Sequence, residues 1–131
     1  MYVSKLNASG GYVWARKFGG AALGTDQGNA VAVDAAGNVY ATGFFHGTVD
    51  FDPGTGTAPL TSAGAQGVFV AKLTPAGGHV WVRQFGGPGD DLATAVAVDA
   101  SGNVVVAGLF GGTADFAPGA GTGGMPYCIG G

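Results

Sequence analysis

The side chains of this sequence best suited to metal chemistry are two carboxylates beside a glycine turn. The segment "DFDPGTG" at 50–56 places Asp50 and Asp52 on alternate positions, and such spacing suits calcium because this hard cation takes oxygen ligands. A second copy of the segment, "DFAPGAG", has Ala117 where the first has Asp52, and no bidentate Glu follows. We therefore favour a turn and strand cap at Asp50 and Asp52, with calcium as the lesser alternative, and predict no metal site.

The two histidines form no catalytic group with other residues. His46 is replaced by Gly111 in the second copy of the surrounding segment, and His79 is replaced by Tyr12. The sequence has neither a Ser, His and Asp constellation nor a phosphate-binding glycine loop with its Lys. We expect no enzyme and no cofactor.

Two Trp and Arg pairs recur at equivalent positions, Trp14 with Arg16 and Trp81 with Arg83. An exposed Trp beside a polar side chain is a common platform for a sugar ring. A Trp that recurs in every repeat is more often core between repeats, with the Arg stem lying along the ring. We favour core and keep carbohydrate binding as the alternative.

Composition restricts the partners of the chain. Its 131 residues are 47% hydrophobic but only 10% charged, and 28 are Gly, which indicates many tight turns around a packed core. The net charge is −3 and the five basic residues are scattered, so we expect no nucleic-acid partner. No apolar run is long enough to span a membrane, and the first residues do not resemble a signal peptide. Cys128 is the only cysteine and we expect a free thiol there, with a bridge between chains as the alternative.

The sequence contains an internal repeat. Residues 2–20 match residues 69–87 at 11 of 19 positions, and residues 30–57 match residues 95–122 at 19 of 28 positions. The first offset is 67 residues and the second is 65. Repeats of this period are typical of stacked supersecondary units.

Each repeat reads as four short strands. "NAVAVD" alternates and runs through the turn residues "DAAGN" into "VYATGFF", which predicts a hairpin. A Pro- and Gly-rich connection follows, and then "VFVAKL" and "HVWVRQF" form a second pair around "TPAGG". Asp26, Asp90 and Asp91 precede the first strands, where we expect them to accept backbone N–H bonds. A repeated four-stranded antiparallel meander predicts an all-β fold made of β-propeller blades.

The signatures "VAVDAAGNVYATG", "GTVDFDPGTGT", "FVAKL" and "VWARKFGG" resemble the bacterial β-propeller repeat often labelled seven-bladed. That family occurs as arrays in large secreted or surface proteins. The resemblance implies propeller architecture and an extracellular or cell-surface location, and it implies little about function.

The order of the strands predicts one complete blade between two half-blades. We expect residues 1–20 to form the outer two strands of one blade, 29–87 a complete blade, and 95–122 the inner two strands of a third, followed by a divergent tail at 123–131. Two blades alone should not close on each other, because propellers need about 4 to 8. We therefore expect a neighbouring copy to complete the half-blades, through an interface formed by Tyr2, Val3, Leu6, Val96, Val98, Val104 and Val106.

These observations favour a non-enzymatic structural protein that assembles with itself, head to tail, into a closed ring or an extracellular filament. The alternatives are a carbohydrate-binding propeller and a fragment of a larger secreted repeat protein. An engineered two-repeat chain also fits the sequence.

Overall fold

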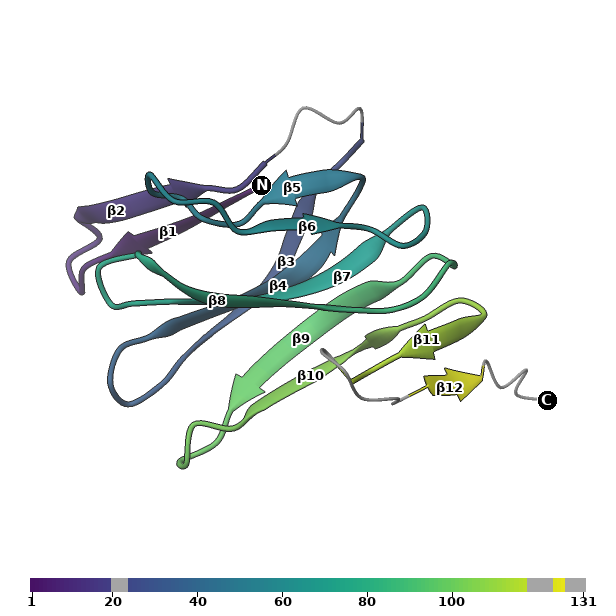
Figure 1. The fold of residues 1–131 in the computed structure, drawn as a ribbon. Coiled ribbons are helices and arrows are strands. Elements are labelled where there is room, and N and C mark those ends of the chain that lie inside the picture. Colours follow the sequence, from purple (N-terminus) through teal and green to yellow (C-terminus); the bar gives the residue numbers. More distant parts are fainter. Residues whose placement is uncertain (20–23, 118–123, 127–131) are drawn as a thin grey trace.

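The computed structural model describes residues 1–19, 24–117 and 124–126, and within these residues every regular element is a β-strand (Figure 1). The predicted all-β fold is confirmed. Cys128 and most of the divergent tail lie outside the described residues. The strands are β1 (Tyr2–Leu6), β2 (Tyr12–Lys17), β3 (Gln27–Val33), β4 (Val39–Phe45), β5 (Thr48–Asp50), β6 (Pro59–Thr61), β7 (Gly67–Leu73), β8 (His79–Phe85), β9 (Leu92–Val98), β10 (Val104–Leu109), β11 (Thr113–Asp115) and β12 (Gly124–Pro126).

The centre of the molecule is a four-stranded antiparallel sheet with the order β3-β4-β7-β8. We call it the central sheet. Alternate residues of a strand point to opposite faces, so Ala41, Phe69 and Leu73 share one face, here called the Phe69 face. Val68, Trp81 and Phe85 share the other, the Phe85 face.

Asp, Gly and Asn form the turns of the β3–β4 hairpin and of its second copy, β9–β10, as the sequence predicts. The carboxylate of Asp34 accepts the backbone N–H groups of Ala36 and Asn38, at 3.0 and 2.9 Å, and Gly37 has a φ of 86°. Asp99 makes the same bonds in the second copy. The side-chain amides of Asn38 and Asn103 donate to these carboxylates and hold the pKa of Asp34 and of Asp99 below the usual value.

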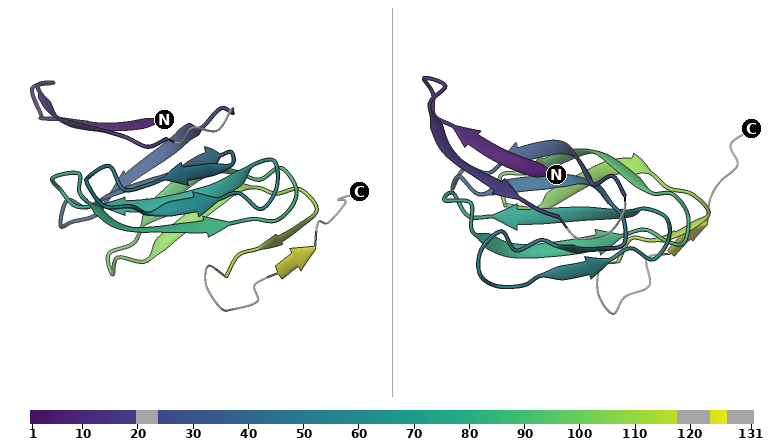
Figure 2. Two further views of the ribbon diagram at one scale, coloured as in Figure 1. Left: turned by 45° about the horizontal axis from the view of Figure 1, so that its top comes forward. Right: turned by 90° about the horizontal axis from the view of Figure 1, so that it is seen from above.

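Two hairpins lie on opposite sides of the central sheet, so that the molecule has three layers (Figures 1 and 2). The β1–β2 hairpin packs on the Phe69 face through Trp14 and Phe18. The β9–β10 hairpin lies on the other side, where β9 contacts β3 and β4 and where Val104, Val106, Val68 and Phe85 line one groove. Each hairpin is a separate two-stranded sheet, and neither pairs with the other.

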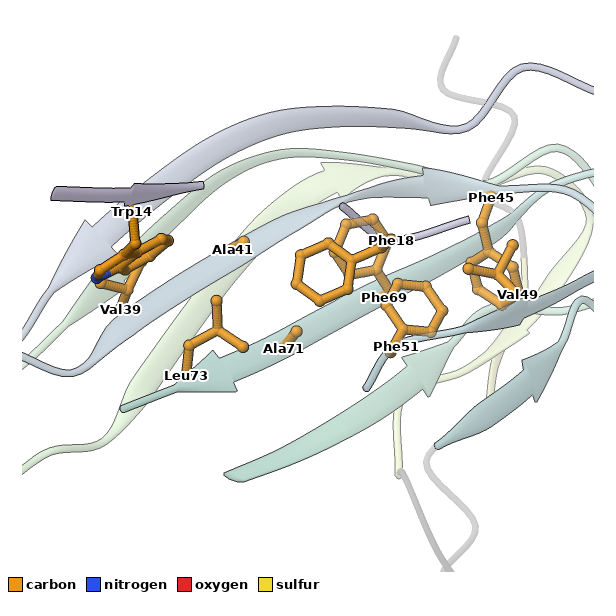
Figure 3. Packing of buried hydrophobic residues seen from close by; sticks show 10 residues of the cluster. All are labelled: Trp14, Phe18, Val39, Ala41, Phe45, Val49, Phe51, Phe69, Ala71 and Leu73. Carbon is orange, nitrogen blue, oxygen red and sulfur yellow. The ribbon is translucent and has the colours of Figure 1, made fainter. Parts of the chain in front are cut away.

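The main core lies between the central sheet and the β1–β2 hairpin (Figure 3). Phe51 contributes a ring that packs 4.7 Å from Phe69 and 5.8 Å from Phe18, measured between centroids. Phe45 meets Phe51 edge-on at 5.3 Å. Aromatic pairs at these separations stabilise a core beyond the area that they bury.

The connection between β4 and β7 is more ordered than the sequence analysis expects. It contains the β5–β6 hairpin, in which Val49 pairs with Leu60, and both Val49 and Phe51 are fully buried. The equivalent connection after β10 contains the β11–β12 hairpin. Strands of three residues are too short to show a periodic pattern, so composition alone predicts only an irregular connection here.

Candidate functional site

Trp14 and Arg16 join the first hairpin to the central sheet. Trp14 is only 5% exposed, and its indole Nε1 donates to the carbonyl of Pro75 at 2.9 Å. The Arg16 guanidinium donates through Nε to the Gly77 carbonyl at 3.0 Å and through Nη2 to the Ala76 carbonyl at 2.9 Å. Arg16 also lies over the Trp14 ring, 5.5 Å from its centroid. We call this arrangement the Trp14 clamp, and it binds the β7–β8 turn, Thr74–Gly78.

Trp81 and Arg83 repeat this pair on β8, but no turn covers them among the described residues. Trp81 is half-buried and Arg83 is exposed. Arg83 lies over the Trp81 ring at 5.8 Å and donates to the carbonyl of Val82 at 2.9 Å. The Tyr40 ring meets Trp81 edge-on at 6.1 Å.

The outer edge of β1 pairs with no strand among the described residues, and its residues Tyr2 and Leu6 are exposed. Tyr2 is 74% exposed, whereas Phe69, its counterpart in the central sheet, is 1% exposed. Leu6 is 57% exposed, whereas its counterpart Leu73 is fully buried. Val3 is half-buried and packs against the chain's own core.

The free edge of β10 shows the same contrast with its counterpart β4. Val105 is 62% exposed, whereas its counterpart Tyr40 is 1% exposed. A groove of about 580 Å³ separates β10 from the Phe85 face of the central sheet, and Val68, Phe85 and Val106 are among its lining residues. Four residues that the sequence analysis assigned to assembly are half-buried on this hairpin, namely Val96, Val98, Val104 and Val106.

A family model described as Beta-propeller repeat (SBBP) matches the chain twice, at residues 13–43 and 80–109. The chain carries two β-propeller repeats. Each matched segment runs through three consecutive strands, β2-β3-β4 and then β8-β9-β10. Each matched segment therefore runs from one sheet of the structure into the next.

A curated protein is also similar to this chain. The uncharacterized WD repeat-containing protein L264 of Acanthamoeba polyphaga mimivirus is 26% identical over 119 residues. The aligned part covers 80% of this chain and 8% of that protein, so the chain spans a small fraction of its relative's length.

Two aspartates that precede inner strands of the repeats accept hydrogen bonds from backbone N–H groups of nearby loops. Asp91 is 1% exposed and accepts the N–H groups of Gly87 at 2.7 Å and Gly111 at 3.2 Å. Asp26 accepts the N–H of His46 at 3.0 Å. The predicted role of Asp26 and Asp91 as acceptors of backbone N–H bonds is confirmed. Asp90 is exposed, and its backbone forms an isolated parallel β-bridge with that of Gln66.

The Asp50 and Asp52 carboxylates are engaged with the backbone of their own loop. Asp50 accepts the N–H groups of Asp52 at 3.0 Å and Ala58 at 2.8 Å, and Asp52 accepts that of Gly54 at 2.7 Å. The Ala58 bond is the main reason that the pKa of Asp50 lies below its usual value. This loop geometry closes the β5–β6 hairpin.

The two histidines lie apart in the fold. His46 contacts the Thr25 carbonyl through Nδ1 at 2.7 Å, and His79 has a buried Nδ1 without a hydrogen-bond partner among the described residues. No group of three His, Cys, Asp or Glu suited to a metal occurs in the described part of the chain. No helix in that part is long and apolar enough to cross a membrane.

Sequence reasoning missed one part of the site, the β7–β8 turn that receives the Trp14 clamp. Nothing in the local sequence links Trp14 to Pro75, because the two residues are 61 positions apart. The signal available in the sequence was a Gly-Gly turn before both Trp residues, "SGG" before Trp14 and "AGG" before Trp81.

Proposed function

We propose that this protein is a non-enzymatic, structural propeller protein that assembles with itself through shared blades. One observation carries the proposal: Tyr2 and Leu6 on β1 and Val105 on β10 are exposed, whereas their counterparts in the central sheet are buried. Unpaired sheet edges with apolar side chains pair readily with another strand. The two edges are complementary, because β1 corresponds to β7 and β10 corresponds to β4.

The pairing of β4 with β7 predicts the register of the shared blade. Ala41 pairs with Ala71 and Thr42 pairs with Val70 in the central sheet. Transferred by the repeat offsets, these pairs place Val106 of one copy opposite Ser4 of the next, and Ala107 opposite Val3. Tyr2 and Leu6 then lie where Phe69 and Leu73 lie in the complete blade.

The shared blades would give each copy the equivalent of two blades. Because propellers contain about 4 to 8 blades, three copies would close a six-bladed ring and four copies an eight-bladed ring. A rotation that misses closure would propagate into a filament. We place the assembly outside the cell or at its surface, on the resemblance to repeats of secreted and surface proteins.

Carbohydrate binding is the weaker alternative, because it needs open indole faces in both repeats. Trp14 offers none, since it is 5% exposed and its indole N–H is bonded to Pro75.

A second alternative is that the chain is part of a longer repeat protein, whose further repeats would fill the same edges as a second copy does. That outcome predicts a chain that stays monomeric when isolated.

Disulfide cross-linking tests the proposal and its register. In a Cys128→Ser background, the Ser4→Cys and Val106→Cys pair should cross-link copies under mild oxidation, because the two side chains share one face of the shared blade. The control pair, Lys5→Cys with Val106→Cys, should cross-link poorly, because neighbouring residues of a strand point to opposite faces.

The product sizes on a non-reducing gel, together with light scattering of the unmodified chain, separate the outcomes. A limiting covalent trimer or tetramer indicates a ring, and an open ladder indicates a filament. A monomer by light scattering at millimolar concentration, with no cross-linked species, would overturn the proposal.

A further inference from the structure

We propose that Trp81 and Arg83 form a docking site for the β1–β2 turn, Asn7–Gly11, of a second copy of this chain. The inference rests on the proposed self-assembly and specifies which side chains join the copies. It comes from the Trp14 clamp, which shows within one chain how a Trp and Arg pair binds the turn of the next blade. Trp81 and Arg83 are the same pair one repeat later.

The second pair is already arranged as the filled clamp is. The Arg guanidinium lies 5.5 Å from the ring centroid of Trp14 in the first pair and 5.8 Å from that of Trp81 in the second. In both pairs Nη1 of the Arg donates to the carbonyl of the preceding residue, at 3.0 Å for Arg16 and 2.9 Å for Arg83. Docking would therefore need little rearrangement, which lowers its entropic cost.

The proposed occupant has the same backbone as the turn in the filled clamp. Asn7 N–H donates to the Gly11 carbonyl at 2.8 Å, and Thr74 N–H donates to the Gly78 carbonyl at 2.8 Å. Gly10 and Gly77 share a φ of 81°. Asn7 Oδ1 accepts the N–H of Gly11 at 2.8 Å, the bond that Thr74 Oγ1 makes with Gly78 at 2.9 Å.

The two turns differ in what covers them. Gly77 is buried, and a Cβ there would lie 3.0 Å from Cδ2 of Trp14 and 3.0 Å from Nε of Arg16. Gly10 is exposed, with nothing within 4 Å of an added Cβ. Gly10 thus keeps the space that an approaching Trp and Arg pair requires, and no side chain of the described residues fills that space.

The contacts transfer by the repeat offset of 67 residues. Trp81 Nε1 would donate to the Ala8 carbonyl of the second copy, and Arg83 would donate through Nε to the Gly10 carbonyl and through Nη2 to the Ser9 carbonyl. All three acceptors are backbone oxygens. The change from Pro75 and Ala76 to Ala8 and Ser9 therefore leaves the acceptors intact.

The docked turn, Asn7–Gly11, and the free edge of β1 belong to the same hairpin, β1–β2. A copy whose β1 pairs with β10 therefore brings its Asn7–Gly11 turn toward the Phe85 face, which carries Trp81. Strand pairing gives the shared blade, and the clamp attaches that blade to its neighbour. The two contacts support each other because one rigid hairpin makes both.

Matched substitutions at the two clamps test the inference. Arg83→Lys keeps the charge but removes the planar fork that two carbonyls require. We expect it to raise the concentration for half-assembly about tenfold or more, with little change in the thermal midpoint of the dissociated chain, because Arg83 is exposed there. Trp81→Phe should act in the same direction. The control, Arg16→Lys, should lower the thermal midpoint of the dissociated chain, because it weakens a contact within one copy.

Indole hydrogen exchange gives a second readout, since the chain has only two Trp residues. Both indole N–H groups should be protected in the assembly, and on dilution Trp81 should lose protection while Trp14 keeps it. If the unmodified chain assembles but Arg83→Lys and Trp81→Phe assemble equally well, or if the Trp81 N–H exchanges freely in the assembly, this inference is wrong and self-assembly stands. A chain that never assembles overturns both.

Discussion

The indole Nε1 of Trp14 donates a 2.9 Å hydrogen bond to the carbonyl oxygen of Pro75, 61 positions further along the chain. This bond joins two sheets that share no strand pairing, and Arg16 strengthens it with two further bonds to the same turn. Beside the side-chain packing of the main core, this part of the contact joins side chains of one sheet to backbone carbonyls of the other. Such a contact tolerates sequence change in the turn, provided that its backbone conformation is kept.

Truncation of Trp14 should destabilise the chain strongly. Trp14→Ala removes a buried aromatic side chain, so we expect the free energy of unfolding to fall by about 3–5 kcal/mol. Trp14→Phe keeps most of the ring and loses the bond to Pro75, which should cost nearer 1 kcal/mol. Urea denaturation at a fixed chain concentration measures both.

Trp81→Ala is the matched control at a half-buried site. Measured on the dissociated chain, it should cost clearly less than Trp14→Ala. Equal losses at the two positions would mean that the two pairs are equally covered within one copy, contrary to their burial.

Removal of the Asp91 carboxylate should loosen the corner between the central blade and the next. Asp91→Ala leaves the partly buried N–H groups of Gly87 and Gly111 without this acceptor, and we expect a loss of about 1–3 kcal/mol in total. Asp90→Ala, one residue earlier and exposed, should change stability little. Comparable losses for the two variants in urea denaturation would contradict the assigned role of Asp91.

The sequence predicted much of this fold because the repeat shows each strand twice. The segment "VFVAKL" was predicted as a strand and forms β7, and "DAAGN" located the turn that Asp34 and Gly37 form. The roles of Asp26 and Asp91 at the blade corners also followed from their position before the inner strands. These features depend on local patterns, which a single sequence displays.

The parts that escaped prediction depend on contacts between distant residues. The β5–β6 hairpin is held by the Asp50 carboxylate and by Val49 and Phe51, which are buried in the main core. Likewise, nothing near Pro75 shows that its carbonyl accepts a bond from Trp14. The sequence indicated that Trp14 belongs to a core between repeats, but not which turn completes that core.

The turn aspartates should titrate below the ordinary range. Because the Asn38 amide donates to Asp34, the folded-state pKa of Asp34 lies below its unfolded value of about 3.9. A group with a lowered folded-state pKa stabilises the fold fully above the unfolded pKa, and this contribution is lost as pH falls through the folded pKa. Carbon-13 NMR of the side-chain carboxyls should give midpoints below about 3.9 for Asp34 and Asp99.

Substitution of the two partner amides separates the two titrations. Asn38→Ala should raise the midpoint of Asp34 and leave that of Asp99 unchanged, and Asn103→Ala should do the reverse. If Asn38→Ala leaves the Asp34 midpoint in place, the amide is not the cause of the lowered pKa.

Gly43 lies where two strands of the central blade approach too closely for a side chain. A Cβ at Gly43 would overlap the Gln27 carbonyl and lie 3.0 Å from the Cα of Gly28, beside the irregular register of β3 and β4. The obstacle is backbone, so it cannot move aside as a flexible side chain does. We expect Gly43→Ala to lower the free energy of unfolding by about 1–3 kcal/mol or more.

Gly28→Ala tests whether this cost comes from the close approach rather than from loss of glycine in the strand. Gly28 faces Gly43 across the same strand pair, but an added Cβ there meets nothing within 4 Å. Gly28→Ala should therefore be nearly neutral or slightly stabilising, because alanine restricts the unfolded chain more than glycine does. Similar losses for the two variants in urea denaturation would show that the register of this hairpin differs from the one described.

The same close approach recurs in the β9–β10 hairpin, where Gly108 lies against the Leu92 carbonyl. A wrong register for β3–β4 would therefore also weaken the strand register that we transferred to the shared blade.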